Sequence, residues 1–270
     1  MNFKNYLILF AALTMGAIAF AGETKKIEDN SFLVEEAYNQ EPGILQHIQS
    51  FQYMKDKTWG YTFTQEWPLP RQTHQFSYTL PVSRVLGPPS ETGLGDLSLN
   101  YRYQLLLKEP FALAPRFSLL LPTGNYEKGL GRDAVGIQIG IPLSVEVAEK
   151  WVTHWNVGTT VTPRSREQGG ARADTLGFNL GASAVFLAAQ NFNMMLETVW
   201  TSVQNVVADG STQRQSTFFL NPGVRFAINC KCGLQVVPGV AMPIGVGPSK
   251  GERGVFTYLS FEHSLWKAKE

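Results

Sequence analysis

The sequence predicts an all-β fold, a transmembrane, antiparallel, up-and-down β-barrel of about 12 strands that follows a cleaved signal peptide. Three observations predict it. The chain begins with a short apolar stretch. The remainder alternates between apolar and polar residues with the period of two that strands require. The connections between the expected strands also alternate between long and short, as they do in outer-membrane barrels.

The composition sets limits on function. The 270-residue chain is 44% hydrophobic and 17% charged, with a formal net charge of +1. These values fit one folded domain or one barrel and exclude a disordered chain. They also argue against a nucleic-acid partner, because there is no excess of cations to displace counterions from phosphates.

The first 21 residues have the layout of a secretory signal peptide. Lys4 supplies a positive start, residues 6–20 are apolar, and Ala19-Phe20-Ala21 places small residues where a signal peptidase needs them. About 15 apolar residues are short for a retained membrane anchor, since a spanning helix needs about 20. We therefore expect a mature chain that begins at Gly22.

Residues 22–43 are rich in acidic side chains and end in Glu41-Pro42-Gly43. This stretch predicts either a periplasmic leader or a plug that folds inward, and both alternatives stay open here. The barrel itself is expected to span residues 44–270.

The alternation is clearest in the stretch from Asp96 to Leu107. Here Leu97, Leu99 and the odd-numbered residues after them are apolar, while the even-numbered residues up to Gln104 are polar. Such runs are about 12 to 14 residues long, whereas strands in soluble proteins have about 5 or 6 residues. A tilted transmembrane strand needs about 9 to 11 residues. The length therefore favours a membrane barrel over a soluble sandwich.

Twelve strands follow from this pattern. We expect them at Ile44–Met54, Thr58–Trp67, Gln72–Val82, Leu94–Leu107, Phe111–Pro122, Ala134–Val147, Trp151–Thr162, Asp174–Leu187, Phe192–Gln204, Gln215–Asn229, Gly233–Val246 and Gly254–Trp266.

The links between these strands alternate in length from the third strand on. The long links are Ser83–Gly93, Thr123–Asp133, Pro163–Ala173, Asn205–Arg214 and Gly247–Arg253. The short links are Pro68–Arg71, Lys108–Pro110, Ala148–Lys150, Ala188–Asn191 and Cys230–Cys232. This rhythm is typical of barrels with long loops outside the cell and short turns in the periplasm.

Several prolines lie inside the expected strands, where each removes a ladder hydrogen bond and predicts a bulge or an irregular strand. Among them are Pro115, Pro122, Pro142, Pro222, Pro238 and Pro243.

Several stretches resemble the outer-membrane "transporter" family named for the phenol meta-pathway. They are Ser31–Ile48, Gly93–Leu106, Leu121–Asn125, Asn221–Asn229, Val237–Gly245 and Tyr258–Glu262. Their order and spacing carry the resemblance over nearly the whole mature chain. The resemblance implies an outer-membrane barrel linked to the passage of small, often aromatic, hydrophobic compounds, and it implies no catalytic residues. Because the family name reflects gene context, phenol is not carried over as a solute.

Parity alone places a set of charged residues on the lumen face. They are Glu66, Asp96, Arg102, Arg116, Glu146, Glu197 and Arg225, with Glu262 less securely assigned. One interpretation is a constriction that selects solutes by charge. The other is a network of ion pairs that fills the lumen, because twelve strands lie between a filled barrel and an open one.

Other chemistry has little support in the sequence. The four histidines His47, His74, His154 and His263 have no ligand-pair spacing, so no metal or other cofactor is expected. A barrel phospholipase would carry its histidine and serine two residues apart on one strand, and none of the four has such a serine. The pair Cys230 and Cys232 would form a strained disulfide, which favours reduced thiols. We therefore predict that the protein is not an enzyme.

The sequence thus predicts a monomeric, porin-like barrel in the outer membrane of a Gram-negative cell. We expect passive passage of a small, aromatic or hydrophobic solute, with outer-membrane lipid, lipopolysaccharide and the barrel-assembly machinery as partners. A structural barrel with a side-chain-filled lumen is the alternative, and a lipid hydrolase is the more remote one.

Overall fold

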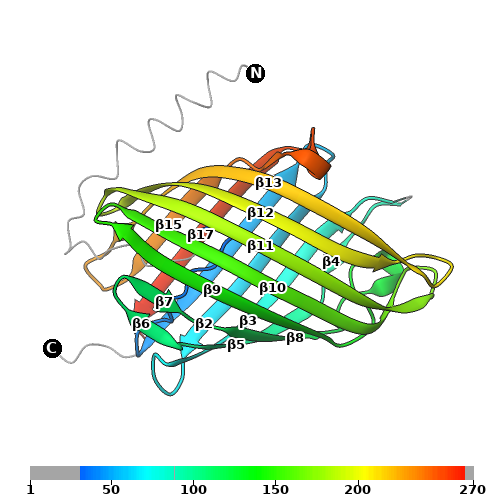
Figure 1. The fold of residues 1–270 in the computed structure, drawn as a ribbon, viewed down its shortest axis with the longest axis horizontal. Helices are drawn as coiled ribbons and strands as arrows, with labels where there is room; N and C mark the ends of the chain where they lie inside the picture. Colours follow the sequence, from blue (N-terminus) through cyan, green and yellow to red (C-terminus); the bar gives the residue numbers. More distant parts are fainter. Residues whose placement is uncertain (1–30, 88, 265–270) are drawn as a thin grey trace.

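The computed structural model describes residues 31–87 and 89–264, and within them seventeen strand segments form one closed sheet (Figure 1). The signal peptide expected at residues 1–21 lies outside the described residues. The segments are β1 (Ile44–Met54), β2 (Trp59–Pro68), β3 (His74–Val85), β4 (Glu91–Leu94), β5 (Leu97–Tyr103), β6 (Leu106–Lys108), β7 (Phe111–Leu113), β8 (Arg116–Leu121), β9 (Gly136–Ala148), β10 (Trp151–Arg166), β11 (Arg172–Ala189), β12 (Phe192–Val206), β13 (Thr212–Phe226), β14 (Ile228–Asn229), β15 (Gln235–Ala241), β16 (Ile244–Gly245) and β17 (Gly254–Ser264).

The segments combine into a closed, 12-stranded antiparallel β-barrel. Segments β4 to β6 make up one strand of the wall, and β7 with β8, β13 with β14, and β15 with β16 make up three others. The barrel closes where β1 pairs with β17 from Ile44↔Ser264 to Met54↔Gly254. All twelve expected strands are present, which confirms the predicted fold class. In the described part of the chain no helix is long and apolar enough to cross a membrane.

The apolar face of the wall points outward. On β9, Ile137, Ile139 and Ile141 are 44%, 49% and 44% exposed, while Ser144 on the other face is buried. An apolar side chain this exposed is stable where the surroundings are lipid rather than water. The interior is lined mainly by the polar, alternate residues, as the period-two pattern predicts.

The rhythm of the connections differs from the prediction. Strands β10 and β11 pair as far as Arg166↔Arg172, and β12 and β13 pair as far as Val206↔Thr212. About half of each of these two expected long links is therefore strand, because the hairpins continue beyond the apolar band. We call the end of the barrel where β1 begins the turn end, and the opposite end the loop end.

The prolines coincide with irregular places in the wall. Pro115 and Pro243 coincide with breaks between assigned segments, and Pro122 follows the end of β8. Pro142, Pro222 and Pro238 lie within continuous strands, but each lies where the pairing with one neighbouring strand is interrupted, as an irregular ladder predicts. A proline is tolerated there because only its N–H is lost, while its carbonyl still accepts a hydrogen bond, as that of Pro142 does from Ala114.

Candidate functional site in the barrel lumen

A peptide without helix or strand structure, Ser31–Gln40, lies inside the barrel, and we call it the lumen segment. Such a peptide leaves most of its backbone N–H groups without backbone partners, and a buried one must find other acceptors. Inward-facing side chains around the wall supply them. Going along the segment, the acceptors are Glu197 on β12, Asn156 on β10, Ser144 on β9, Gln104 after β5 and Gln75 on β3. The segment therefore crosses the lumen from the β12 wall to the β3 wall.

Glu197 anchors the first residues of the segment. Its side chain is fully buried, and its Oε1 accepts hydrogen bonds from three successive backbone N–H groups, those of Phe32, Leu33 and Val34, at 2.8, 2.9 and 3.1 Å. Its Oε2 accepts a hydrogen bond from Asn221 Nδ2 at 2.6 Å. Hydrogen bonds to a carboxylate are stronger than those between neutral groups. A single side chain thus fixes the start of the described segment to the wall.

Phe32 fills a recess in the wall beside this anchor. Its ring centroid lies 5.5 Å from that of Phe256 and 5.4 Å from that of Tyr258. The back of the recess is formed by Gly223 and Gly239, where an added Cβ would lie only 2.6 and 2.5 Å from atoms of the Phe32 ring. The recess therefore exists because these two inward positions carry no side chain.

Two arginines hold the middle of the segment. Arg102 donates to the carbonyls of Glu36 and Tyr38 at 3.0 and 2.7 Å and to Asn39 Oδ1 at 2.8 Å. Arg116 forms an ion pair with Glu35. Both arginines had been assigned to the lumen by parity, but their partners on the segment could not be read from the strand pattern.

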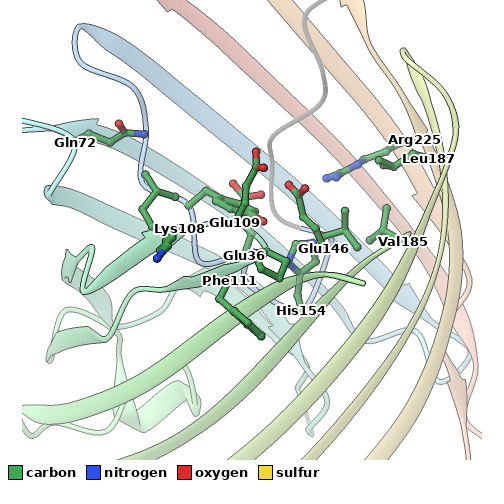
Figure 2. Close-up of a pocket in the computed structure, with 14 residues that line it drawn as sticks. Glu36, Gln72, Lys108, Glu109, Phe111, Glu146, His154, Val185, Leu187 and Arg225 are labelled. Atoms are coloured by element: carbon green, nitrogen blue, oxygen red, sulfur yellow. The ribbon is translucent and has the colours of Figure 1, made fainter. Parts of the chain in front are cut away.

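The lumen segment lies between two cavities. The first, of about 370 Å³, opens near the turn end and has Glu36 and Tyr38 of the segment in its lining; Figure 2 shows Arg225 pointing into it. The second, of about 130 Å³, lies on the other side and has Phe32 and Glu35 in its lining. We call them the vestibule and the inner cavity.

At the loop end, residues 122–135 are held to the wall by hydrogen bonds and ion pairs. Asp96 accepts backbone N–H groups of Gly124 and Arg132 at 2.9 and 3.0 Å. Asp133 pairs with Arg166 and Arg172 at 3.0 and 2.7 Å. Asp96 was predicted among the lumen charges, but its contacts are with this loop rather than with the lumen segment.

The remaining predicted charges divide between the segment and the vestibule. Glu66 accepts from Gln75, and Glu262 accepts from Gln46 at 3.1 Å; both glutamines also bind Gln40 of the segment. Glu146 and Arg225 line the vestibule. The structure thus places most of these residues in the lumen, as the alternation along the strands predicts. The alternation does not predict which groups they bind.

Sequence reasoning missed the neutral acceptors and one histidine contact. Asn156, Ser144, Gln104 and Gln75 share an amide or hydroxyl on the polar face, and nothing in the strand pattern distinguishes them from the other polar residues of that face. His154 Nδ1 lies 2.8 Å from Ser144 Oγ, on the neighbouring strand rather than two residues along one strand.

This histidine–serine pair is buried in the wall beside the segment. Ser144 is fully buried, and its hydroxyl already accepts the N–H of Ala37 at 2.8 Å. Within residues 31–87 and 89–264, no three His, Cys, Asp or Glu side chains group as metal ligands. Cys230 and Cys232 are both free thiols.

Over residues 43–236 the chain matches the family described as "Putative MetA-pathway of phenol degradation". It is similar to the COG4313 outer membrane channel from Pseudomonas putida F1, with 15% identity, coverage of 90% of this chain and 98% of that chain, and a TM-score of 0.65. The NanC porin (10% identity, coverage of 82% and 100%, TM-score 0.51) and the KdgM porin (8%, 83% and 99%, 0.50) share the fold more distantly. A search of curated proteins finds none that matches.

The fold and the lumen together define an outer-membrane β-barrel. The matched residues cover more than half of the chain, and the protein belongs to the phenol-degradation MetA-pathway family. This confirms the resemblance drawn from the sequence motifs.

Proposed function

We propose that the protein is a passive channel for small solutes and that the lumen segment restricts its lumen. The observation that carries the proposal is the pair of cavities on opposite sides of the segment. The segment is held by side chains of the wall rather than by strand pairing. Its contacts can therefore be exchanged for water without opening the ladder of the barrel.

We further propose that the solutes are small and aromatic or hydrophobic. A strip of apolar residues in the otherwise polar lumen supports this class. It consists of Phe32, Leu33, Ile48, Val152, Val185, Leu187, Met195, Ala241, Phe256 and Tyr258, and we call it the apolar strip. Val152, Val185 and Leu187 also line the vestibule, so the strip leads from there to the ring-sized recess of Phe32.

A solute-uptake screen in cells with and without the protein tests this proposal. Aromatic and hydrophobic solutes should enter faster when the protein is present, and polar solutes of the same size should gain less. Faster entry of polar solutes alone would contradict the proposed solute class.

The proposed orientation puts the turn end in the periplasm, in a monomer surrounded by outer-membrane lipid and lipopolysaccharide and inserted by the assembly machinery. Cysteines introduced at Lys128 and Gln168 should react with an impermeant maleimide on whole cells, whereas one at Glu149 should not. The reverse labelling would mean that the barrel is inserted the other way.

The alternative is a structural barrel whose lumen stays filled. The fully buried Glu197 with its four donors favours this reading, because a buried carboxylate that loses its donors destabilises the protein. A barrel whose lumen stays filled by the segment would conduct no ions while the segment is present, and tethering the segment to the wall would leave its current unchanged. Ion current through a tethered variant therefore separates the two.

A further inference from the structure

The wall behind Phe32 contains a seam between β13 and the strand formed by β15 and β16. Gly223 to Arg225 pair with Ala241 to Gly239, and Phe219 and Leu220 pair with Gly245 and Ile244. Between these two pairings the described strands show only the bond from Met242 N–H to the Pro222 carbonyl, at 3.0 Å. The neighbouring ladder of β12 with β13 runs without a break from Phe192↔Phe226 to Val206↔Thr212.

Prolines weaken this seam. Pro222 on β13 and Pro238 and Pro243 on the opposite strand have no N–H, so none of them can donate to a ladder. Proline in a sheet is usually confined to edges or bulges, yet Pro222 faces a paired strand on each side. The seam can therefore separate with the loss of fewer hydrogen bonds than any equal length of the β12–β13 ladder.

A deep apolar groove lies on the outer face of the same seam. Its volume is about 790 Å³, and its lining includes Met194, Pro222, Val224, Val240 and Met242. These side chains lie on the lipid-facing side of the wall, where exposed apolar groups such as Met194 and Met242 are 49% and 51% exposed.

The groove and the recess of Phe32 share one thin piece of wall. Gly223 and Ala241 line the groove from outside. From inside, Gly223 forms the back of the recess, and Ala241 packs with Phe32 in the apolar strip. A Cβ at Gly223 would touch both the Phe32 ring and the Ala241 methyl, at 2.6 and 2.7 Å. Backbone and one methyl group are therefore what separates the Phe32 ring from the lipid-facing groove.

We propose that this seam is a lateral portal, through which small uncharged aromatic solutes pass between the lumen and the membrane when Phe32 leaves its recess. The inference rests on the proposed channel function and adds a route to it. An aromatic solute would follow the apolar strip from the vestibule, occupy the recess in place of the Phe32 ring, and move into the groove. The polar inner cavity, lined by hydroxyls such as those of Ser50, Thr62 and Thr64, offers such a solute no comparable path toward the loop end.

A reversible cross-link across the seam tests the portal. Val224 and Val240 are direct partners and both line the groove, so cysteines at these positions can be joined by a short thiosulfonate linker. The matched control is the pair Thr198 and Leu220, which are partners in the unbroken β12–β13 ladder. Both variants carry Cys230→Ser and Cys232→Ser, and the same protein is measured before and after reduction, so that a folding defect cannot imitate the result.

The readout is protein-dependent uptake of phenylnaphthylamine, a neutral aromatic dye, into cells with intact lipopolysaccharide. Ion current through the same proteins in planar bilayers is recorded in parallel. Cross-linking Val224→Cys to Val240→Cys should reduce dye uptake at least about tenfold and leave the ion current unchanged, and reduction should restore uptake. The control cross-link should alter neither.

Dye uptake that persists across the locked seam, in a protein that conducts ions, would overturn the portal while the channel stands. If the unlinked protein admits neither dye nor ions, the channel function itself fails, and the portal fails with it.

Discussion

At the scale of single residues, the lumen is organised by contacts between the segment and positions that look unremarkable in sequence. Glu197 binds three consecutive N–H groups, and Gly223 and Gly239 make room for one ring. Parity predicted that Glu197 faces inward, since successive strand residues alternate sides. It could not predict the partner, because residues 31–40 lie more than a hundred residues away in the chain and have no strand pattern of their own.

The recess of Phe32 gives a prediction at this scale. Gly239→Ala would place a methyl group against the ring and should destabilise the protein by about 1 to 3 kcal/mol, the usual effect of overpacking. In a Phe32→Ala background the same substitution should have little effect, because the ring is gone. A double-mutant cycle by thermal unfolding measures the coupling. Additive effects would contradict the assigned contact.

Glu197 gives a second prediction. Glu197→Gln keeps the size of the side chain but removes its charge and replaces one of its two acceptor oxygens with an NH2 donor, which weakens the hydrogen bonds from the segment. The amides of Phe32, Leu33 and Val34 should therefore exchange with deuterium at least about tenfold faster, the equivalent of about 1.4 kcal/mol. The matched control is Glu252→Gln, on an exposed glutamate at the loop end. Unchanged exchange in the Glu197 variant would mean that the segment is held elsewhere.

At the scale of the elements, the strands were the most predictable feature of the molecule. Lipid on one side and a polar lumen on the other impose a strict alternation, so β1, β9 and β12 begin and end within two residues of their expected bounds. The links were less predictable. Arg172 and Thr212 look like loop residues in composition, yet they continue the hairpins, because pairing with an existing neighbour outweighs a weak local preference.

The outward face of β9 gives the prediction for this scale. Ile139→Arg puts a charge into lipid near the middle of a strand, which should cost about 2 to 4 kcal/mol. Gln138→Glu, which puts a charge on the adjacent inward position, should cost less, since a carboxylate there can still accept from Arg116 and from the Thr160 hydroxyl. Heat-modifiable mobility of the two variants shows the folded fraction, and equal losses would mean that the faces are exchanged.

At the scale of the whole molecule, the barrel is a closed wall with a peptide laid across its interior and a cavity on each side. The family and the fold establish an outer-membrane barrel, while the function depends on whether the lumen segment moves. The acidic stretch before the first strand predicted two alternatives, a leader or a plug. Composition could not choose between them, because burial of this segment is decided by acceptors scattered over five parts of the wall.

The central claim is that the lumen segment is what restricts the channel, and ion current through single barrels in planar bilayers tests it most directly. The wild-type barrel is compared with a variant that lacks residues 31–40 and with a Val34→Cys, Gly181→Cys variant, free of Cys230 and Cys232, that can tether the segment to the wall. A Cβ at Gly181 would lie 3.0 Å from Val34 Cγ2, so the tether requires little movement. Deletion should raise the current, and oxidation of the tethered variant should lower it until a reductant restores it. Folded barrels that carry the same current in all three states would contradict the account.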